Sequence, residues 1–283
     1  MRASASLTCL ALACATAASA AAPGPKDTLA LVFCAPGYPG TTEEAQPRMD
    51  DLAAALGELA QWPTGRLSAV YFPQEKAGLA RVAQPDAALL LAPLPFFLAK
   101  EKELGLTARL QVLQKGAAAT QRWTLVAKQG HLKAAQDLDG WALFSTAGYA
   151  PAFVRAALAG FGPLPATVKV TAGGQVLSSL RKASTGEKLA VLLDAEQAAS
   201  LTTLPFAAEL EAVHVGPALP VAVLATVQDR LGAADWKALA AALPTLPSTP
   251  RGAAALEGVR LAGFGPLDEA ALAAARAAGG GAK

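Results

Sequence analysis

The chain has 283 residues, enough for one large domain or two smaller ones. It carries 24 basic and 22 acidic residues, for a formal net charge of +2, and the basic residues are scattered along the sequence. A chain without a basic cluster is not expected to bind nucleic acid. Hydrophobic residues make up 53% of the chain, which favours helices packed closely on a sheet.

The N-terminal segment 1–20 has the features of a secretory signal peptide. A positive start is followed by the apolar run Leu7–Ala18, and Ala18-Ser19-Ala20 supplies a small-residue cleavage site. We therefore expect a signal peptide at residues 1–20 and a secreted mature protein. Cys14 lacks the preceding leucine pattern of a lipoprotein, so a soluble product is favoured over a lipid anchor. No segment is long enough for a membrane span, and an integral membrane protein is not expected.

Cleavage after Ala20 leaves Cys34 as the only cysteine of the mature chain. A lone thiol cannot form an internal disulfide, so the fold must depend on its hydrophobic core. Cys34 lies in the apolar run Leu29–Ala35, where a buried and inert side chain is expected. His131 and His214 have no cysteine or histidine at metal-ligand spacing, so neither a zinc site nor another cofactor is expected.

Apolar runs of strand length alternate with stretches of helix length, a pattern typical of a mainly parallel α/β fold. Several runs are apolar throughout, as expected for strands covered on both faces. The expected strands are Leu29–Ala35, Leu67–Phe72, Ala87–Ala92, Arg109–Gln114, Trp123–Lys128, Trp141–Phe144, Thr167–Thr171, Leu189–Leu193, Ala212–Val215 and Val221–Ala225.

Helices are expected between these strands. The first covers about Gln46–Ala60, where apolar residues recur at three- and four-residue spacing and Pro47 fits the first turn. The others are expected at about Lys76–Val82, Gly148–Leu158, Gln175–Lys182, Ala195–Ser200, Ala233–Leu243 and Pro250–Val259.

The layout predicts two lobes, because the chain builds one set of elements, leaves it for a second set and then returns. Such a path creates a cleft crossed by two links, expected near residues 122–126 and 216–220, and clefts at strand ends are favoured ligand sites. The expected division is a lobe 1 at residues 28–124 and 217–276, a lobe 2 at residues 125–216, and a disordered Gly/Ala-rich tail at residues 277–283.

The segment Trp141–Tyr149 indicates a short strand that turns through a corner of hydroxyl groups and glycine into a helix. Such a corner directs backbone N–H groups, hydroxyls and the positive end of a helix dipole to one point, which suits an oxyanion. The alternative for Ser145 and Thr146 is an ordinary helix cap, a role that these residue types often have.

Six segments of the chain carry motifs in a fixed order: Ala35-Pro36-Gly37-Tyr38-Pro39, Phe96-Phe97, Leu138-Asp139-Gly140, Ser145-Thr146-Ala147-Gly148-Tyr149, Leu192-Leu193-Asp194-Ala195 and Leu261–Leu267. These motifs and their order resemble those of the periplasmic phosphate/phosphonate-binding proteins of ABC importers, which have the bilobal type II solute-binding fold. The likeness covers about Leu29 to Leu272. One segment departs from the family, since its frequent Ser-His-Asp is here Gly174-Gln175-Val176.

The resemblance implies a two-lobed α/β fold with a ligand cleft between the lobes. Tyr38 would cover the ligand, and Asp194 and Gln175 would tune selectivity. The residues alone leave other roles open, since Asp194 suits a helix cap, Gln175 a solvated helix start and Phe96 the core. The full set of implied ligand-binding residues is Tyr38, Phe96, Ser145, Thr146, Ala147, Gly148, Tyr149, Gln175 and Asp194.

Together with this resemblance, the sequence predicts a secreted, periplasmic and monomeric solute-binding protein that captures a small tetrahedral oxyanion, phosphate or phosphonate-like, and delivers it to an ABC permease. The alternative is a periplasmic sensor subunit that uses the same cleft for a different organic anion and reports to a membrane partner. An enzyme is not expected, because no pattern supplies a general base for Ser145.

Overall fold

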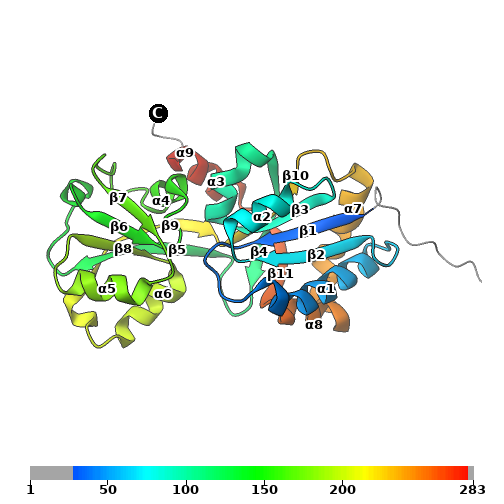
Figure 1. Ribbon diagram of the computed structural model, residues 1–283, viewed down its shortest axis with the longest axis horizontal. Coiled ribbons are helices and arrows are strands. Elements are labelled where there is room, and N and C mark those ends of the chain that lie inside the picture. Colours follow the sequence, from blue (N-terminus) through cyan, green and yellow to red (C-terminus); the bar gives the residue numbers. More distant parts are fainter. Residues whose placement is uncertain (1–27, 280–283) are drawn as a thin grey trace, which may run out of the picture.

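The computed structural model describes residues 28–279, so the expected signal peptide and Cys14 lie outside the described residues. Two β-sheets with flanking helices form two lobes arranged along the long axis of the molecule (Figure 1). The two-lobed α/β class expected from the sequence is confirmed. Within the described part, no helix is long and apolar enough to cross a membrane.

Lobe 1 contains six strands, and their apolar sequences explain why the central ones are buried on both faces. The strands are β1 (Leu29–Cys34), β2 (Leu67–Phe72), β3 (Ala87–Pro93), β4 (Leu106–Gln114), β10 (Ala222–Val227) and β11 (Leu261–Pro266). Their order is β11-β4-β10-β3-β1-β2. The helices of this lobe are α1 (Thr42–Leu59), α2 (Glu75–Val82), α3 (Leu94–Leu104), α7 (Ala233–Ala242) and α8 (Pro250–Gly258), with the 3-10 helix η4 (Leu243–Ser248).

Lobe 2 contains five strands in the order β7-β6-β8-β5-β9. These are β5 (Thr120–Lys128), β6 (Ala142–Ser145), β7 (Lys169–Ala172), β8 (Leu189–Leu193) and β9 (Leu210–Pro220). The helices are α4 (Pro151–Ala157), α5 (Val176–Ser184) and α6 (Ala195–Ser200), with 3-10 helices at Ala135–Leu138, Leu201–Thr203 and Ala207–Glu209. Both sheets are mixed instead of mainly parallel, because β10 and β11 in lobe 1 and β5 and β9 in lobe 2 pair antiparallel to their neighbours.

Apart from the short 3-10 helices, two α-helices and one strand were not expected from the sequence: α3, the C-terminal helix α9 (Glu269–Gly279) and β11. Because α9 includes residues 277–279, the expectation of a disordered tail is wrong for these three residues, and residues 280–283 lie outside the described part. The helix expected from Gly148 begins only at Pro151. The link expected at residues 122–126 is part of β5.

The chain crosses between the two sheets twice, and the crossings lie side by side. One runs from β4 to β5 and the other from β9 to β10. Next to the crossings β5 and β9 pair antiparallel, with Thr120 opposite Pro220, and the Arg122 guanidinium donates to the Gly216 carbonyl oxygen at 2.8 Å. The two lobes are therefore connected by a paired two-stranded bridge.

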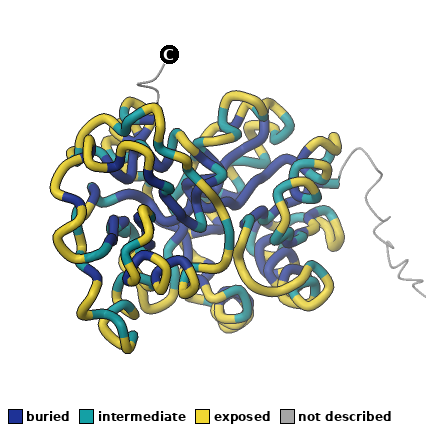
Figure 2. The backbone as a smooth tube through the Cα atoms, turned by 60° about the vertical axis from the view of Figure 1, so that its left-hand side comes forward, coloured by how far each residue is buried: buried dark blue, intermediate teal, exposed yellow. Residues whose placement is uncertain are grey.

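Each lobe has a hydrophobic cluster of its own, and a third, larger cluster runs through both lobes. It joins Phe96 and Phe97 of α3 to Trp123 of β5, Phe153 of α4 and Leu272 of α9. Figure 2 shows buried backbone running through the centre of the molecule. Cys34 is buried at the edge of the larger cluster as expected, and burial, with a smaller contribution from the Glu75 carboxylate, raises the pKa of its thiol to about 12.

Candidate functional site

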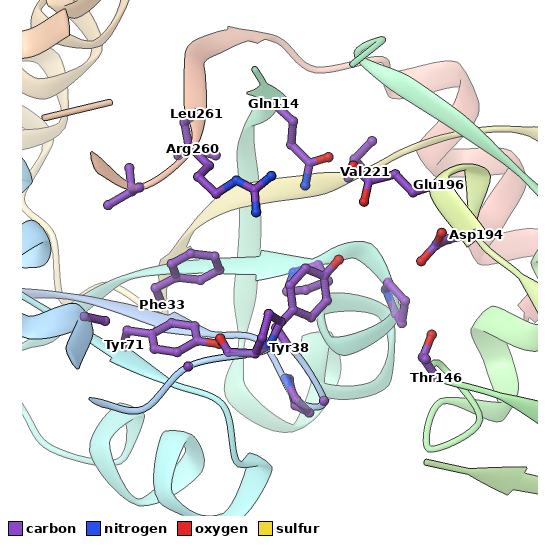
Figure 3. Close-up of a pocket in the computed structure, with 18 of the residues that line it drawn as sticks. Phe33, Tyr38, Tyr71, Gln114, Thr146, Asp194, Glu196, Val221, Arg260 and Leu261 are labelled. Carbon is purple, nitrogen blue, oxygen red and sulfur yellow. The ribbon is translucent and has the colours of Figure 1, made fainter. Parts of the chain in front are cut away.

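A cavity of about 470 Å³ lies between the lobes. Lobe 1 contributes the loop after β1, the start of α1 and the junction of α8 with β11, and lobe 2 contributes the turn after β6 and the start of α6. Figure 3 shows side chains from both lobes directed toward this space. The cavity is therefore built by segments that are far apart in the sequence.

Tyr38 lies on the loop after β1, and the local sequence fixes its position. Gly37 and Gly40 adopt φ values of 83° and 95°, which glycine accepts without strain. The Tyr71 hydroxyl donates to the Pro39 carbonyl oxygen at 3.1 Å and holds the loop against β2. Tyr38 remains 42% exposed and lines the cavity, so its ring is available to a ligand.

The Tyr38 hydroxyl is protonated at neutral pH, as tyrosine ordinarily is, and its surroundings favour the protonated form further. Burial raises its pKa to about 12, and the carboxylates of Asp194 and Glu196 across the cavity add to the rise. A protonated phenol can donate a hydrogen bond to an anionic or carbonyl oxygen. Tyr149 also lines the cavity, and burial, followed by the proximity of Tyr38, raises the pKa of its hydroxyl as well.

The corner after β6 separates its two hydroxyl groups. Ser145 is fully buried, and its hydroxyl donates to the Leu192 carbonyl oxygen at 2.9 Å and accepts from the Ala147 N–H at 3.2 Å. Thr146, the next residue, lines the cavity, and its hydroxyl has no hydrogen-bond partner among residues 28–279. Thr146 is thus the hydroxyl of this corner that is available to a ligand.

The backbone groups expected to hold an oxyanion are engaged in the turn. The Gly148 N–H donates to the Ser145 carbonyl oxygen at 3.1 Å, and the Ala147 N–H is bonded to the Ser145 hydroxyl. Gly148 does not line the cavity, and its Cα lies so close to β7 that an added Cβ would be 2.2 Å from the Thr171 carbonyl oxygen. Close packing of the turn against β7 therefore explains why a glycine is required at position 148.

Asp194 combines the two roles that the sequence left open. It is the N-cap of α6, where its Oδ1 accepts from the Gln197 N–H at 2.8 Å, and it also lines the cavity. Burial raises the pKa of its carboxyl, and the hydrogen bond from Gln197 opposes this rise.

The remaining two expected residues do not line the cavity. Phe96 is fully buried in the core that joins the lobes. This is the alternative to ligand binding that the sequence left open. Gln175 is exposed and precedes α5. The set brought together at the cavity therefore consists of Tyr38, Thr146, Ala147, Tyr149 and Asp194.

Sequence reasoning missed the cationic and most of the aromatic lining. Arg48 from α1 and Arg260 from the α8–β11 junction line the cavity, and Figure 3 shows the Arg260 guanidinium directed into it. Phe33, Tyr71 and Trp123 complete the aromatic wall. The signal for Arg48 was weak, because one arginine on an amphipathic helix is usually a solvated side chain.

No protein-family model matches the chain, and no curated protein matches its sequence. The likeness is to solved structures. XAC2383 from Xanthomonas citri bound to chloride ion superimposes with a TM-score of 0.68 at 16% identity, covering 89% of this chain and 97% of that chain. The same protein bound to ATP gives a TM-score of 0.66 at 16% identity, with 89% and 98% coverage.

Phosphonate receptors have the same architecture. PhnD1 from Prochlorococcus marinus in complex with methylphosphonate gives a TM-score of 0.56 at 12% identity, covering 88% of this chain and 97% of that chain. The binding component of an ABC phosphonate transporter from Pseudomonas aeruginosa gives 0.52 at 12% identity, with 87% and 84% coverage. At these identities the likeness shows the fold alone, which is that of periplasmic solute-binding proteins.

Proposed function

We propose that this chain is a secreted solute-binding protein that captures a small oxyanion-bearing solute between its lobes and delivers it to an ABC importer. The observation that carries the proposal is the interlobe cavity, whose lining comes from both lobes. A solute in this position contacts both lobes at once, and its binding energy then favours the closed arrangement. Closure about the paired bridge of β5 and β9 presents one defined surface to a membrane partner.

Hydrogen-bond donors in the cavity support an oxyanion as the recognised group. The Tyr38 hydroxyl is protonated at neutral pH, and the Thr146 hydroxyl has no partner among the described residues. Neutral donors held in place by the fold bind an anionic oxygen with little further ordering cost. The methylphosphonate complex of the Prochlorococcus marinus protein, which shares the fold, supports phosphonates as first probes.

The adjacent residues Ser145 and Thr146 provide a matched test. We expect methylphosphonate to raise the melting temperature of the purified protein, and Thr146→Ala to weaken binding roughly ten- to a hundredfold, equivalent to about 1.5–3 kcal/mol for a hydrogen bond to a charged group. Ser145→Ala should lower stability by about 1–3 kcal/mol, because the Leu192 carbonyl oxygen loses its donor, without changing affinity. Calorimetry and thermal unfolding measure the two effects.

The proposal is wrong if methylphosphonate, phosphate, phosphite and sulfate all leave the melting temperature unchanged. Delivery is tested separately, by uptake of labelled methylphosphonate in cells with and without the gene. If the purified protein binds methylphosphonate but cells without the gene take it up normally, the importer proposal fails and the sensor alternative is favoured.

A further inference from the structure

We infer that the ligand is a zwitterionic organic acid whose acid group binds lobe 1 at Arg48 and Arg260 and whose amine faces Asp194 and Glu196 of lobe 2. This inference rests on the proposed function of the same cavity and gives its substrate class. Arg48 and Arg260 are called the basic pair below, and Asp194 and Glu196 the acidic pair.

The basic pair lacks counter-ions. Neither guanidinium takes part in any ion pair formed among residues 28–279, although both line the cavity. The aliphatic part of Arg48 packs beside Gly258, two residues before Arg260, with its Cβ and Cγ 3.6 Å from where a Cβ on that glycine would lie. Two unpaired guanidinium groups that line the lobe 1 side of one cavity favour an anionic group on this side, since guanidinium binds carboxylates and phosphonates bidentately.

The neighbouring charges of lobe 1 do not neutralise this pair. Lys115 is already paired with Glu257. The Glu44 carboxylate accepts the Thr41 N–H at 3.1 Å in the cap of α1, which holds it at the helix start. The anion-binding capacity of the lobe 1 wall therefore comes from Arg48 and Arg260.

The acidic pair lies on the opposite wall. Figure 3 shows Asp194 and Glu196 on the lobe 2 side of the cavity, across from Arg260. Neither carboxylate takes part in an ion pair in the described part of the chain. The acid group that Thr146 contacts in the proposed function would face only carboxylates if it stayed on the lobe 2 wall, whereas a position against the lobe 1 wall also places it beside guanidinium groups. Charge thus directs the acid group to lobe 1 and a cationic group to lobe 2.

The size of the cavity favours a ligand that spans both walls. A single tetrahedral oxyanion would leave most of the 470 Å³ to water, whereas organic ligands occupy pockets of roughly 300–1,000 Å³. The Tyr38 side chain lines the same cavity as Arg260 and Asp194 (Figure 3). The face of its ring suits the aliphatic body of the ligand and attracts an amine bound nearby.

The backbone at Arg260 permits a test that separates binding from folding. Arg260 has a φ of 59°, a left-handed conformation that glycine adopts more easily. Gln61 has a φ of 56° in the equivalent position after α1 and does not line the cavity. Each N–H donates to the carbonyl oxygen three residues earlier at 3.0 Å, so Gln61→Gly is a matched control for Arg260→Gly.

The experiment is calorimetric titration with 3-aminopropylphosphonate, propylphosphonate and propylamine. We expect the wild-type protein to bind the aminophosphonate at least tenfold more tightly than propylphosphonate, and propylamine more weakly than either. Arg260→Gly should lower the affinity for both phosphonates at least tenfold while its melting temperature stays equal or rises. Gln61→Gly should have a similar melting temperature and wild-type affinities. Asp194→Asn should remove the preference for the aminophosphonate.

Four results would overturn the inference. Wild-type affinity of Arg260→Gly for propylphosphonate would exclude the basic pair, and equal wild-type affinities for the two phosphonates would exclude the acidic pair. If Thr146→Ala weakens phosphonate binding and Arg260→Gly does not, the proposed function stands and this inference fails. If no phosphonate binds the wild-type protein, both fail together.

Discussion

At the scale of single residues, Asp194 shows how one side chain can serve both the fold and the cavity. Its Oδ1 caps α6, while burial raises the pKa of the carboxyl. A raised pKa means that the folded state holds the proton more tightly than the unfolded state does. The resulting stabilisation is complete below the unfolded pKa of 3.8 and is lost as the pH rises through the folded value.

Because the pKa of the Asp194 carboxyl is raised, the effect of Asp194→Asn on stability should depend on pH. Asparagine keeps the oxygen that caps the helix but carries no charge to desolvate. We expect the melting temperature of the variant, relative to wild type, to be higher at pH 7 than at pH 3. Asp229→Asn, which removes an exposed carboxylate outside the cavity, is the control. The prediction is wrong if the melting temperatures of Asp194→Asn and wild type differ by the same amount at pH 3 and at pH 7.

The sequence located some cavity residues and missed others for identifiable reasons. Ser145 and Thr146 are adjacent at the end of a strand, where successive side chains point in opposite directions, so only one of them could face the cavity. Their sequence alone does not say which. Arg48 and Arg260 are separated by more than two hundred residues. Only the packing of α1 against α8 brings them to one wall, and no local pattern records that contact.

At the scale of elements, the sequence predicted the strands more accurately than the helices. Apolar runs such as Leu189–Leu193 are buried, and their length identifies them. Helix α3 was missed because Pro93 and Pro95 suggest a break, although proline fits a first turn. Strand β11 was missed because its glycines and proline suggest a turn. It lies at the edge of its sheet, where proline is tolerated.

The turn after β6 gives a prediction at this scale. A methyl group at Gly148 would lie 2.2 Å from the Thr171 carbonyl oxygen, so β7 or the turn must move. We expect Gly148→Ala to destabilise the protein by about 1–3 kcal/mol or more, measured by urea denaturation. Gly174→Ala, in open space on the same lobe, should change stability by less than about 1 kcal/mol. Equal stability of the two variants would show that the turn can withdraw from β7.

At the scale of the whole molecule, the two lobes share a core and are held together by α9. Arg276 of this helix bonds Glu101 of α3, with its Nε 3.0 Å from Oε2, and the Arg155 side chain of α4 donates to the Gly279 carbonyl oxygen. Leu272 is fully buried between these helices. A helix from the end of the chain thus packs on both lobes, on the side away from α1 and α6 (Figure 1).

The shared core predicts that both lobes unfold together. Leu272→Ala should lower stability by about 2–5 kcal/mol and shift the unfolding of both lobes equally. Tryptophan fluorescence and far-UV circular dichroism measure this, because Trp62 and Trp236 report on lobe 1 and Trp123 and Trp141 on lobe 2. Leu177→Ala on α5, where the leucine is 59% exposed, is the control and should have little effect. Two separate transitions would contradict a common core.

The position of β10 has a consequence for the order of events during synthesis. This strand fills the space between β3 and β4, yet it follows every strand of lobe 2 in the chain. A growing chain can therefore complete the five-stranded sheet while β3 and β4 still lack a neighbour between them. Pairing between strands that are distant in the sequence is slow, and the sheet of lobe 1 cannot be completed until β10 has been synthesised. The half that emerges first from the ribosome is the half that is finished last.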